Sequence, residues 1–194
     1  MNVLELALRR VAVDLGKRDV RWALVGGFAV SARSEPRFTR DVDVAVAVAD
    51  DAAAESLVHS LLSEGYRVLA SVEQEETGRL ATIRLDCPVG ERDEVVVDVL
   101  FASSGIESEV AADAEDLEIV PGLHLPVAVA GHLIALKLLA RDDEIRPQDL
   151  VDLRALMVAA TDSDIAVARR AIELITERGY DRGRDLPAAL RSLD

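Results

Sequence analysis

An eight-residue segment, DVDVAVAV from Asp41 to Val48, alternates in polarity without a break and constrains the fold more than any other part of the sequence. Successive side chains of a β-strand point to opposite faces. The four valines therefore share one face of such a strand, and Asp41 and Asp43 share the other face with two alanines. We predict a β-strand over 41–48 that presents two carboxylates in the same direction.

The segments around this strand predict a protein in which strands come first and helices afterwards. Further predicted strands are 21–25, 66–72, 79–86 and 94–101, and predicted helices of the first half are 3–15 and 51–64. Residues 103–118 are acidic and rich in small residues, which favours a loop and a short helix. From Val127 onward the pattern predicts only helices, at 127–142, 147–159 and 162–178, with a weak tail. We expect an α+β core over residues 1–126 and a helical C-terminal part over 127–194, packed as one compact unit.

Composition favours a soluble protein of the reducing cytoplasm. Half of the 194 residues are hydrophobic, and Cys87 is the single cysteine, so no internal disulfide forms. The longest apolar stretch, about 127–140, contains His132 and Lys137 and is shorter than the roughly 20 residues that span a bilayer. The N-terminus lacks the pattern of a signal peptide. We therefore expect neither a membrane segment nor secretion.

The formal net charge of −14 is unevenly distributed. Residues 1–40 carry eight lysines and arginines against four acids, so the remaining 154 residues carry −18. The positive segment leads directly into the Asp41 strand, where it is placed to contact a polyanion. The alternative is that its cations are ordinary solvated helix faces.

Two carboxylates on one face of a strand need an explanation. At about 4 Å and an effective dielectric near 20 they repel each other by roughly 4 kcal/mol. A divalent cation reverses the sign, and oxygen ligands of this kind suit Mg²⁺. Asp98, a lone acid within VVVDVLF, is the candidate third ligand from a neighbouring strand. The alternative is that Asp41 and Asp43 lie on the solvent face of an edge strand.

A Gly-Gly turn precedes the carboxylates. Gly26 and Gly27 follow a predicted strand and open a helix, so that free backbone amides can face a phosphate. The order of strand, Gly-Gly, thirteen further residues and Asp-x-Asp resembles the signature of the DNA polymerase β-like nucleotidyltransferases. Within that superfamily the sequence is most similar to the AbiEii/AbiGii and MenT-type toxins of bacterial toxin–antitoxin systems, over about residues 20–160.

This resemblance implies a mixed sheet with flanking helices and a metal-dependent transfer of a nucleotide. The donor would be a nucleoside triphosphate, ATP among them, and the acceptor a hydroxyl, with the tRNA 3′ end favoured. It implies one or two Mg²⁺ ions on Asp41, Asp43 and Asp98. Gly26, Gly27, Thr39 and Arg40 would contact the nucleotide, and Arg37 or Arg40 would stabilise developing charge. A cognate antitoxin is the implied protein partner.

The second half contributes a buried lysine. Lys137 lies among leucines in GHLIALKLLAR, and a desolvated ammonium needs an anion. On the next predicted helix, Asp149 and Asp152 share a face at i, i+3. By resemblance, Lys137 and Asp152 are catalytic residues and Lys137 also contacts the nucleotide, with Arg146 and Asp149 in the same motif. The alternative is that Lys137 and Asp152 form a salt bridge of purely structural value.

Other readings of the sequence stay open. The resemblance suggests that Thr39 is phosphorylated as a regulatory modification, which would add about two negative charges beside the carboxylates. One rival function is an antibiotic nucleotidyltransferase with a small acceptor. Another is a non-catalytic module that binds a nucleotide or an antitoxin.

Overall fold

The computed structural model describes residues 2–74, 78–90, 94–142, 144–145 and 147–193. Its centre is a mixed sheet of seven strands in the order β3-β4-β5-β2-β1-β7-β6. The strands are β1 (Trp22–Val25), β2 (Val42–Val46), β3 (Arg67–Glu73), β4 (Leu80–Cys87), β5 (Val95–Leu100), β6 (Glu115–Val120) and β7 (Leu123–Val127).

Strand β2 occupies the middle of the sheet and lies within the predicted segment 41–48, although it is shorter and leaves Asp41 directly before it. It runs antiparallel to β1 and parallel to β5. Val42, Val44 and Val46 have no exposed surface, whereas Asp43 between them is half-buried. A central strand with one fully covered face fixes the direction of every side chain on it, since a one-residue slip would bury the aspartates. The alternative, in which Asp41 and Asp43 lie on the solvent face of an edge strand, is therefore wrong.

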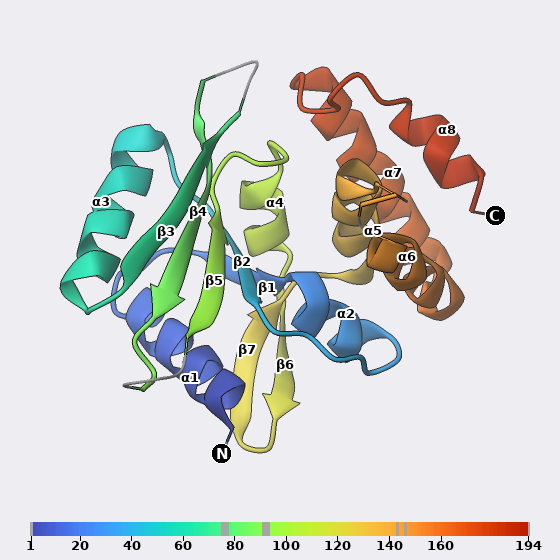
Figure 1. The fold of residues 1–194 in the computed structure, drawn as a ribbon. Helices are drawn as coiled ribbons and strands as arrows, with labels where there is room; N and C mark the ends of the chain where they lie inside the picture. The colour runs from blue at the N-terminus through green and yellow to red at the C-terminus, as the bar shows by residue number, and fades with distance from the viewer. Residues whose placement is uncertain (1, 75–77, 91–93, 143, 146, 194) are drawn as a thin grey trace.

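Helices cover the two sides of the sheet unequally (Figure 1). Helices α1 (Val3–Gly16) and α3 (Asp51–Ser63) lie on one side, and the C-terminal helices gather on the other. The remaining helices are α2 (Gly26–Arg33), α4 (Glu107–Ala112), α5 (Ala130–Ala140), α6 (Pro147–Ala159), α7 (Asp162–Glu177) and α8 (Leu186–Arg191). Helix α7 begins at a capping box in which Thr161 and Asp164 each bind the other's backbone amide.

A hairpin, β6–β7, was not predicted. Its residues fall in a segment for which the sequence favours a loop and in the region before the C-terminal helices. The turn lies at Pro121 and Gly122, where Gly122 has a φ of 73° that a side chain would disfavour. Strand β7 lies beside β1, with Leu24 opposite Val127. Exposed acids on β6 and a proline in β7 hide the strand signal, because both residue types are depleted in strands.

One hydrophobic cluster spans the strands and the C-terminal helices. It contains Leu24 and Val44 of the sheet together with Leu133, Leu153 and Ile172 of α5, α6 and α7. The division at residue 126 remains a prediction. In the part of the chain that the structure describes, no helix has both the length and the hydropathy needed to cross a membrane.

Candidate active site

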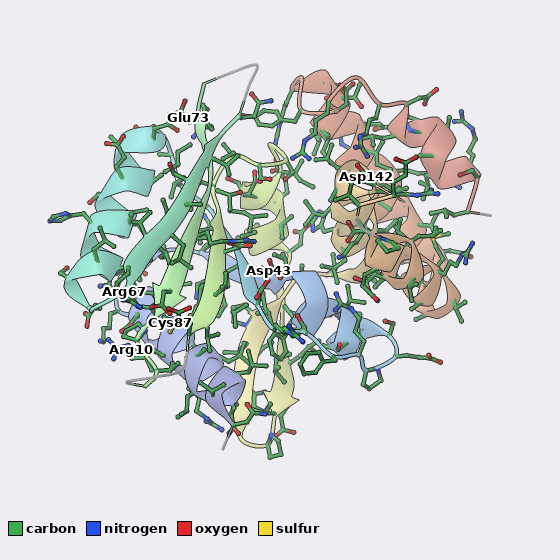
Figure 2. All side chains as sticks on the ribbon, in the orientation of Figure 1. Arg10, Asp43, Arg67, Glu73, Cys87 and Asp142 are labelled. Atoms are coloured by element: carbon green, nitrogen blue, oxygen red, sulfur yellow. The ribbon has the colours of Figure 1, made fainter. Side chains whose placement is uncertain are left out.

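A row of charged side chains crosses the sheet at the level of Asp43. Asp43 of β2 is in register with Asp98 of β5 on one side and with Val25 of β1 on the other. Arg84 of β4 lies opposite Asp98 in the antiparallel pair of β4 and β5. Figure 2 shows Asp43 where the sheet faces the group of C-terminal helices. The predicted proximity of Asp98 to the carboxylate strand is therefore confirmed.

Arg84 donates hydrogen bonds to both carboxylate oxygens of Asp98. Its Nε donates to Oδ1 at 2.8 Å and its Nη2 to Oδ2 at 2.6 Å. This hydrogen-bonded pair raises the pKa of Arg84 above its ordinary value, and the charges of Asp41 and Asp43 act in the same direction. Among the residues that the structure describes, no group of three or more acids, histidines or cysteines is placed to hold a metal ion. The role of Asp98 as a metal ligand therefore stays a prediction.

The Gly-Gly turn brings a helix N-terminus against Asp43. Helix α2 begins at Gly26, which has a φ of 62°, and its N-cap residue, Val25, makes no side-chain cap hydrogen bond. A Cβ at Gly26 would lie 1.9 Å from Oδ2 of Asp43. Only glycine satisfies both the backbone conformation and this close approach. The apolar N-cap offers no acceptor to the first-turn amides of α2, and amides at helix N-termini are groups that bind phosphate.

Thr39 packs against the second glycine. A Cβ at Gly27 would lie 2.6 Å from Oγ1 of Thr39, and this hydroxyl is 3.4 Å from the backbone oxygen of Asp41. Thr39 therefore lies between the N-terminus of α2 and the backbone of Asp41, and its predicted contact with the nucleotide stays a prediction. The guanidinium of Arg40 lies instead over the exposed ring of Phe38, 5.7 Å from its centroid.

Lys137 joins both aspartates of the following helix. Its Nζ is 2.7 Å from Oδ1 of Asp149 and 2.8 Å from Oδ2 of Asp152. The lysine side chain is 12% exposed, and the two aspartates are nearly completely buried. This contact between α5 and α6 confirms the predicted anionic partner of the buried lysine. Arg146, also predicted for this motif, lies outside the described residues.

Arg37 extends this cluster to the loop before β2. Its Nε and Nη2 lie 2.7 Å and 2.8 Å from the two oxygens of Asp152. The predicted role of Arg37 in stabilising developing charge is untested, and its contact with Asp152 shows a structural one. The loop that carries Thr39 is thereby fixed to helix α6.

Burial alone would raise the pKa of Asp152, but its partners reverse the shift. A hydrogen bond from Gln148 at 3.0 Å and the hydrogen bond and charge of Lys137 hold the pKa below its ordinary value. The hydrogen bond from Arg37 acts in the same direction. Asp152 is therefore an ionised acid surrounded by donors.

Two cavities meet at the charged row. The carboxylate cavity, of about 490 Å³, is lined by Gly26, Gly27, Arg37, Thr39, Asp41, Asp43 and residues of α6. The α5 cavity, of about 650 Å³, extends from Asp43 between strands β3–β5 and helix α5. Both cavities are bordered by Gly26, Asp43, Arg84, Asp98 and Lys137. The structure thus brings the predicted glycines, carboxylates, threonine and lysine to one place.

Most cations of the positive N-terminal segment have other partners. Six of its eight make hydrogen bonds or ion pairs within the protein: Arg9, Arg10, Lys17, Arg18, Arg33 and Arg37. Asp14, with no exposed surface, holds Arg10 and Lys17, and Figure 2 places Arg10 away from Asp43. These contacts give most of the cations a role within the protein and leave fewer of them to contact a polyanion.

Sequence reasoning missed Arg84. The signal was present, because an arginine interrupts the apolar run of β4 as Asp98 interrupts that of β5. Pairing the two requires the register of β4 on β5, which depends on the length of the connection between them.

The fold is similar to those of solved nucleotidyltransferases. A nucleotidyltransferase-like protein from Paracoccidioides brasiliensis superposes with a TM-score of 0.55 at 17% identity, covering 96% of this chain and 92% of that one. The lincosamide antibiotic adenylyltransferase LnuA, solved with lincomycin, superposes with a TM-score of 0.53 at 13% identity. The match covers 82% of this chain and 100% of LnuA. For MenT4, a nucleotidyltransferase toxin from Mycobacterium tuberculosis, the TM-score is only 0.37 at 17% identity. The match covers 97% of this chain and 93% of MenT4.

The sequence comparison identifies a family, whereas the similarity to solved structures shows only the fold. No curated protein matches the chain significantly. A family description, the nucleotidyl transferase AbiEii toxin of type IV toxin–antitoxin systems, matches residues 7–194. That match includes the Gly-Gly turn, the carboxylate strand, Lys137 and Asp152, as the resemblance predicted. The chain belongs to the AbiEii nucleotidyl transferase toxin family.

Proposed function

We propose that this protein is a toxin that transfers a nucleotide from a nucleoside triphosphate to an acceptor hydroxyl and releases pyrophosphate. The observation that carries the proposal is the convergence of Asp41, Asp43, the Gly26 amide turn and Lys137 on one cavity of about 490 Å³. Carboxylates, free amides and an ammonium are the groups that bind a metal–triphosphate complex.

The triphosphate is assigned to the carboxylate cavity. Backbone amides of Gly26 and Gly27 donate to phosphate oxygens, and Lys137 provides a fixed positive charge beside them. The hydroxyl of Thr39 lies on the same wall and donates to the same group. Arg37 and Asp152 act as positioning residues, because they fix this wall to helix α6 and orient Lys137.

The donor set fits Mg²⁺. Asp41 and Asp43 offer hard oxygen ligands from one strand, and Asp98 becomes a third ligand only if Arg84 releases it. Mg²⁺ commonly binds through one or two carboxylates, with water and substrate phosphates as the other ligands. When bound, the ion neutralises oxygens on the attacking and leaving groups.

The acceptor that we propose is the 3′ end of a tRNA in the cytoplasm, so that translation stops. A toxin family of this kind also implies a cognate antitoxin that binds the protein. The direct test is incubation with each labelled nucleoside triphosphate, Mg²⁺ and total tRNA. We expect labelled tRNA and pyrophosphate with the wild type and neither with Asp41→Ala. Binding of a nucleotide without turnover would instead support a non-catalytic module.

A small hydroxylated acceptor is the second candidate, because the α5 cavity has the size of a small-molecule site. LnuA, a lincosamide antibiotic adenylyltransferase whose structure contains lincomycin, has a similar fold and supports this candidate. Labelling of a lincosamide or aminoglycoside in place of tRNA in the same assay would establish it.

Phosphorylation of Thr39 is the proposed regulation. A phosphate on this hydroxyl would lie between Gly27 and Asp41, where it would compete with the triphosphate. Intact-mass analysis of protein produced with the product of its neighbouring gene should show one added phosphate, located on Thr39. An unmodified Thr39 peptide in inhibited protein would contradict the hypothesis.

A further inference from the structure

Arg84 is a cation that the sheet places beside the carboxylates of the candidate active site. Arg84 of β4 is in register with Asp98 of β5, and Asp98 is in register with Asp43 of β2. Neighbouring strands lie about 4.8 Å apart, and residues in register share a face of the sheet, so these three side chains are neighbours. The charges of Asp41 and Asp43 also act on Arg84. The guanidinium therefore lies in the field of three carboxylates.

The pair of Arg84 and Asp98 is open to solvent on the arginine side. The side chain of Arg84 is 49% exposed, and that of Asp98 is 13% exposed. The side chain of Lys137, in contrast, is 12% exposed, and those of its two carboxylate partners are 3% and 1% exposed. An ion pair with a half-exposed partner is weak, because water solvates the cation when it leaves. A ligand can therefore displace Arg84 from Asp98 more easily than Lys137 from its aspartates.

Arg84 uses the oxygens that a metal ion at Asp98 would need. Its Nε and Nη2 donate to Oδ1 and Oδ2 of Asp98, so both oxygens already have a cationic partner. In agreement with this pairing, no three acidic, histidine or cysteine side chains are grouped to hold a metal ion within the described ranges. A divalent cation on Asp98 would also lie beside the guanidinium, and two positive charges repel each other. Pairing with Arg84 and metal binding at Asp98 therefore oppose each other.

This opposition acts on a free metal ion and not on a metal–triphosphate complex. Arg84 repels a free divalent ion, whereas the complex of that ion with a triphosphate carries a net negative charge and is not repelled. The coupling is reciprocal. The factor by which Arg84 weakens the affinity for the free ion is the factor by which the bound ion weakens the pairing of Arg84 with Asp98.

We infer that Arg84 competes with a metal ion for Asp98, so that the site selects a metal ion that arrives with the triphosphate over a free one. The inference deepens the proposed function and rests on it for the nucleotide. Arg84 is then a positioning residue, and Asp98 becomes a metal ligand only after Arg84 releases it. Before that step, Arg84 supplies the counter-charge that a nearly buried carboxylate requires.

Binding of Mn²⁺ alone tests the competition, because electron paramagnetic resonance distinguishes the free ion from the bound ion. Arg84→Met removes the charge and both hydrogen bonds and leaves a long side chain on the strand. We expect this variant to bind Mn²⁺ at least about tenfold more tightly than the wild type, a coupling of usual size. A purely structural role of Arg84 would give the opposite sign, since damage to the site weakens binding. Arg84→Lys, which keeps the charge and loses the two-bond geometry, should have an intermediate affinity.

The same sheet offers a matched control. Arg67 of β3 is in register with Asp86 of β4, and its Nε donates to Oδ2 of that carboxylate at 3.0 Å. Figure 2 shows Arg67 well away from Asp43. Arg67→Met therefore also breaks a cross-strand pair of arginine and aspartate, and its affinity for Mn²⁺ should equal that of the wild type.

A double variant shows whether the effect passes through Asp98. Arg84→Met combined with Asp98→Asn should lose the gain and bind Mn²⁺ about as weakly as the wild type. A double variant that keeps the gain would mean that Arg84 acts on Asp41 and Asp43 through its field alone, and the inference would be wrong.

The outcomes separate the inference from the proposed function. If Arg84→Met binds Mn²⁺ no more tightly than the wild type, or if neither protein binds it, the inference is wrong. Calorimetry with Mn²⁺ and a non-hydrolysable triphosphate adds the nucleotide: the wild type should bind the complex, and Arg84→Met should gain less than with the free ion. An equal gain for the free ion and the complex would overturn the selection. If neither protein binds the complex while Arg84→Met still gains affinity for free Mn²⁺, the proposed function fails and the competition for Asp98 is confirmed.

Discussion

Two pairs of aspartates at the carboxylate cavity differ in burial and in the elements that carry them. The strand pair consists of Asp43 on β2 and Asp41 directly before it; both are half-buried and line the cavity. Asp149 and Asp152 lie on helix α6, are 2% and 1% exposed, and are held by Lys137, with Arg37 also on Asp152. The helix pair is bound by cations of the protein itself, whereas the strand pair lines the cavity in which we propose that a metal ion binds.

The difference follows from the secondary structure that carries each pair. A strand directs alternate side chains to one face of the sheet, so Asp43 lies beside residues of the neighbouring strands, such as Asp98 on β5. A helix presents i, i+3 side chains to a second helix, where a lysine on α5 reaches both. We therefore expect the strand pair to govern activity and the helix pair to govern stability as well as the position of Lys137.

The largest expected effect is on catalysis by the strand pair. Asp43→Asn removes one metal-binding charge and keeps the shape of the side chain beside Gly26. We expect the rate of nucleotide transfer to fall by about a thousandfold, or roughly 4 kcal/mol of transition-state stabilisation. The free energy of unfolding should change by less than about 0.5 kcal/mol. Single-turnover labelling and urea denaturation measure the two quantities.

Glu73→Gln, an exposed acid on β3, is the matched control and should leave both quantities unchanged. A large loss of stability in Asp43→Asn would show that the strand pair is structural and would remove the contrast between the two pairs.

The next effect is on stability. Asp152→Ala removes one of the two carboxylates that contact Lys137 and also the carboxylate that contacts the half-buried Arg37. Breaking a buried ion pair in this way costs roughly 3–5 kcal/mol. We expect a loss of that size in urea denaturation, and Asp41→Ala should show almost none. Equal losses in the two variants would contradict the assignment of separate roles.

The sequence predicted the placement of the strand pair better than the contacts around Lys137, Asp152 and Arg37. Alternation over Asp41–Val48 predicts both carboxylates on one face of a strand. In the structure the strand is shorter, Val42–Val46, so Asp41 lies directly before it, and both aspartates line the carboxylate cavity. The partner of Lys137 was also predictable, since a buried ammonium requires an anion. The contact of Arg37 with Asp152 was not, because 115 residues separate them and the loop before β2 has no regular geometry.

The missed features share a physical cause. The pairing of Arg84 with Asp98 depends on strand register, and β7 joins the sheet beside β1, where the paired residues Leu24 and Val127 are more than 100 residues apart in the chain. Local patterns carry no information on such pairings. They predict which side chains share a face and do not predict which strands are neighbours.

A paired substitution separates the structural and functional roles of Lys137. Lys137→Met should cost about 3 kcal/mol, because it leaves two buried carboxylates with one cation fewer. In Lys137→Met with Asp149→Asn the charges balance again, and stability should return to within about 1 kcal/mol of the wild type. If Lys137 also contacts the triphosphate, both variants should bind it about tenfold more weakly, or about 1.4 kcal/mol.

Calorimetry with a non-hydrolysable triphosphate measures that affinity. Recovery of both stability and affinity in the double variant would establish the lysine as purely structural.

The smallest effect is the pH dependence of the helix pair. The pKa of Asp152 is held below its ordinary value of 3.8 in the folded protein, so the unfolded chain binds the proton more readily. The stabilisation by this carboxylate is therefore fully present above about pH 4 and is lost as the pH falls through the lower pKa of the folded state. We expect the difference in unfolding free energy between the wild type and Asp152→Asn to stay constant from about pH 7 to 5 and to shrink below about pH 4. Urea denaturation of both proteins across that range measures it. A difference that already shrinks near pH 6 would mean that Asp152 takes up its proton far more easily than an acid held by Lys137 and Arg37 should, and the helix pair would then resemble an open site such as the strand pair.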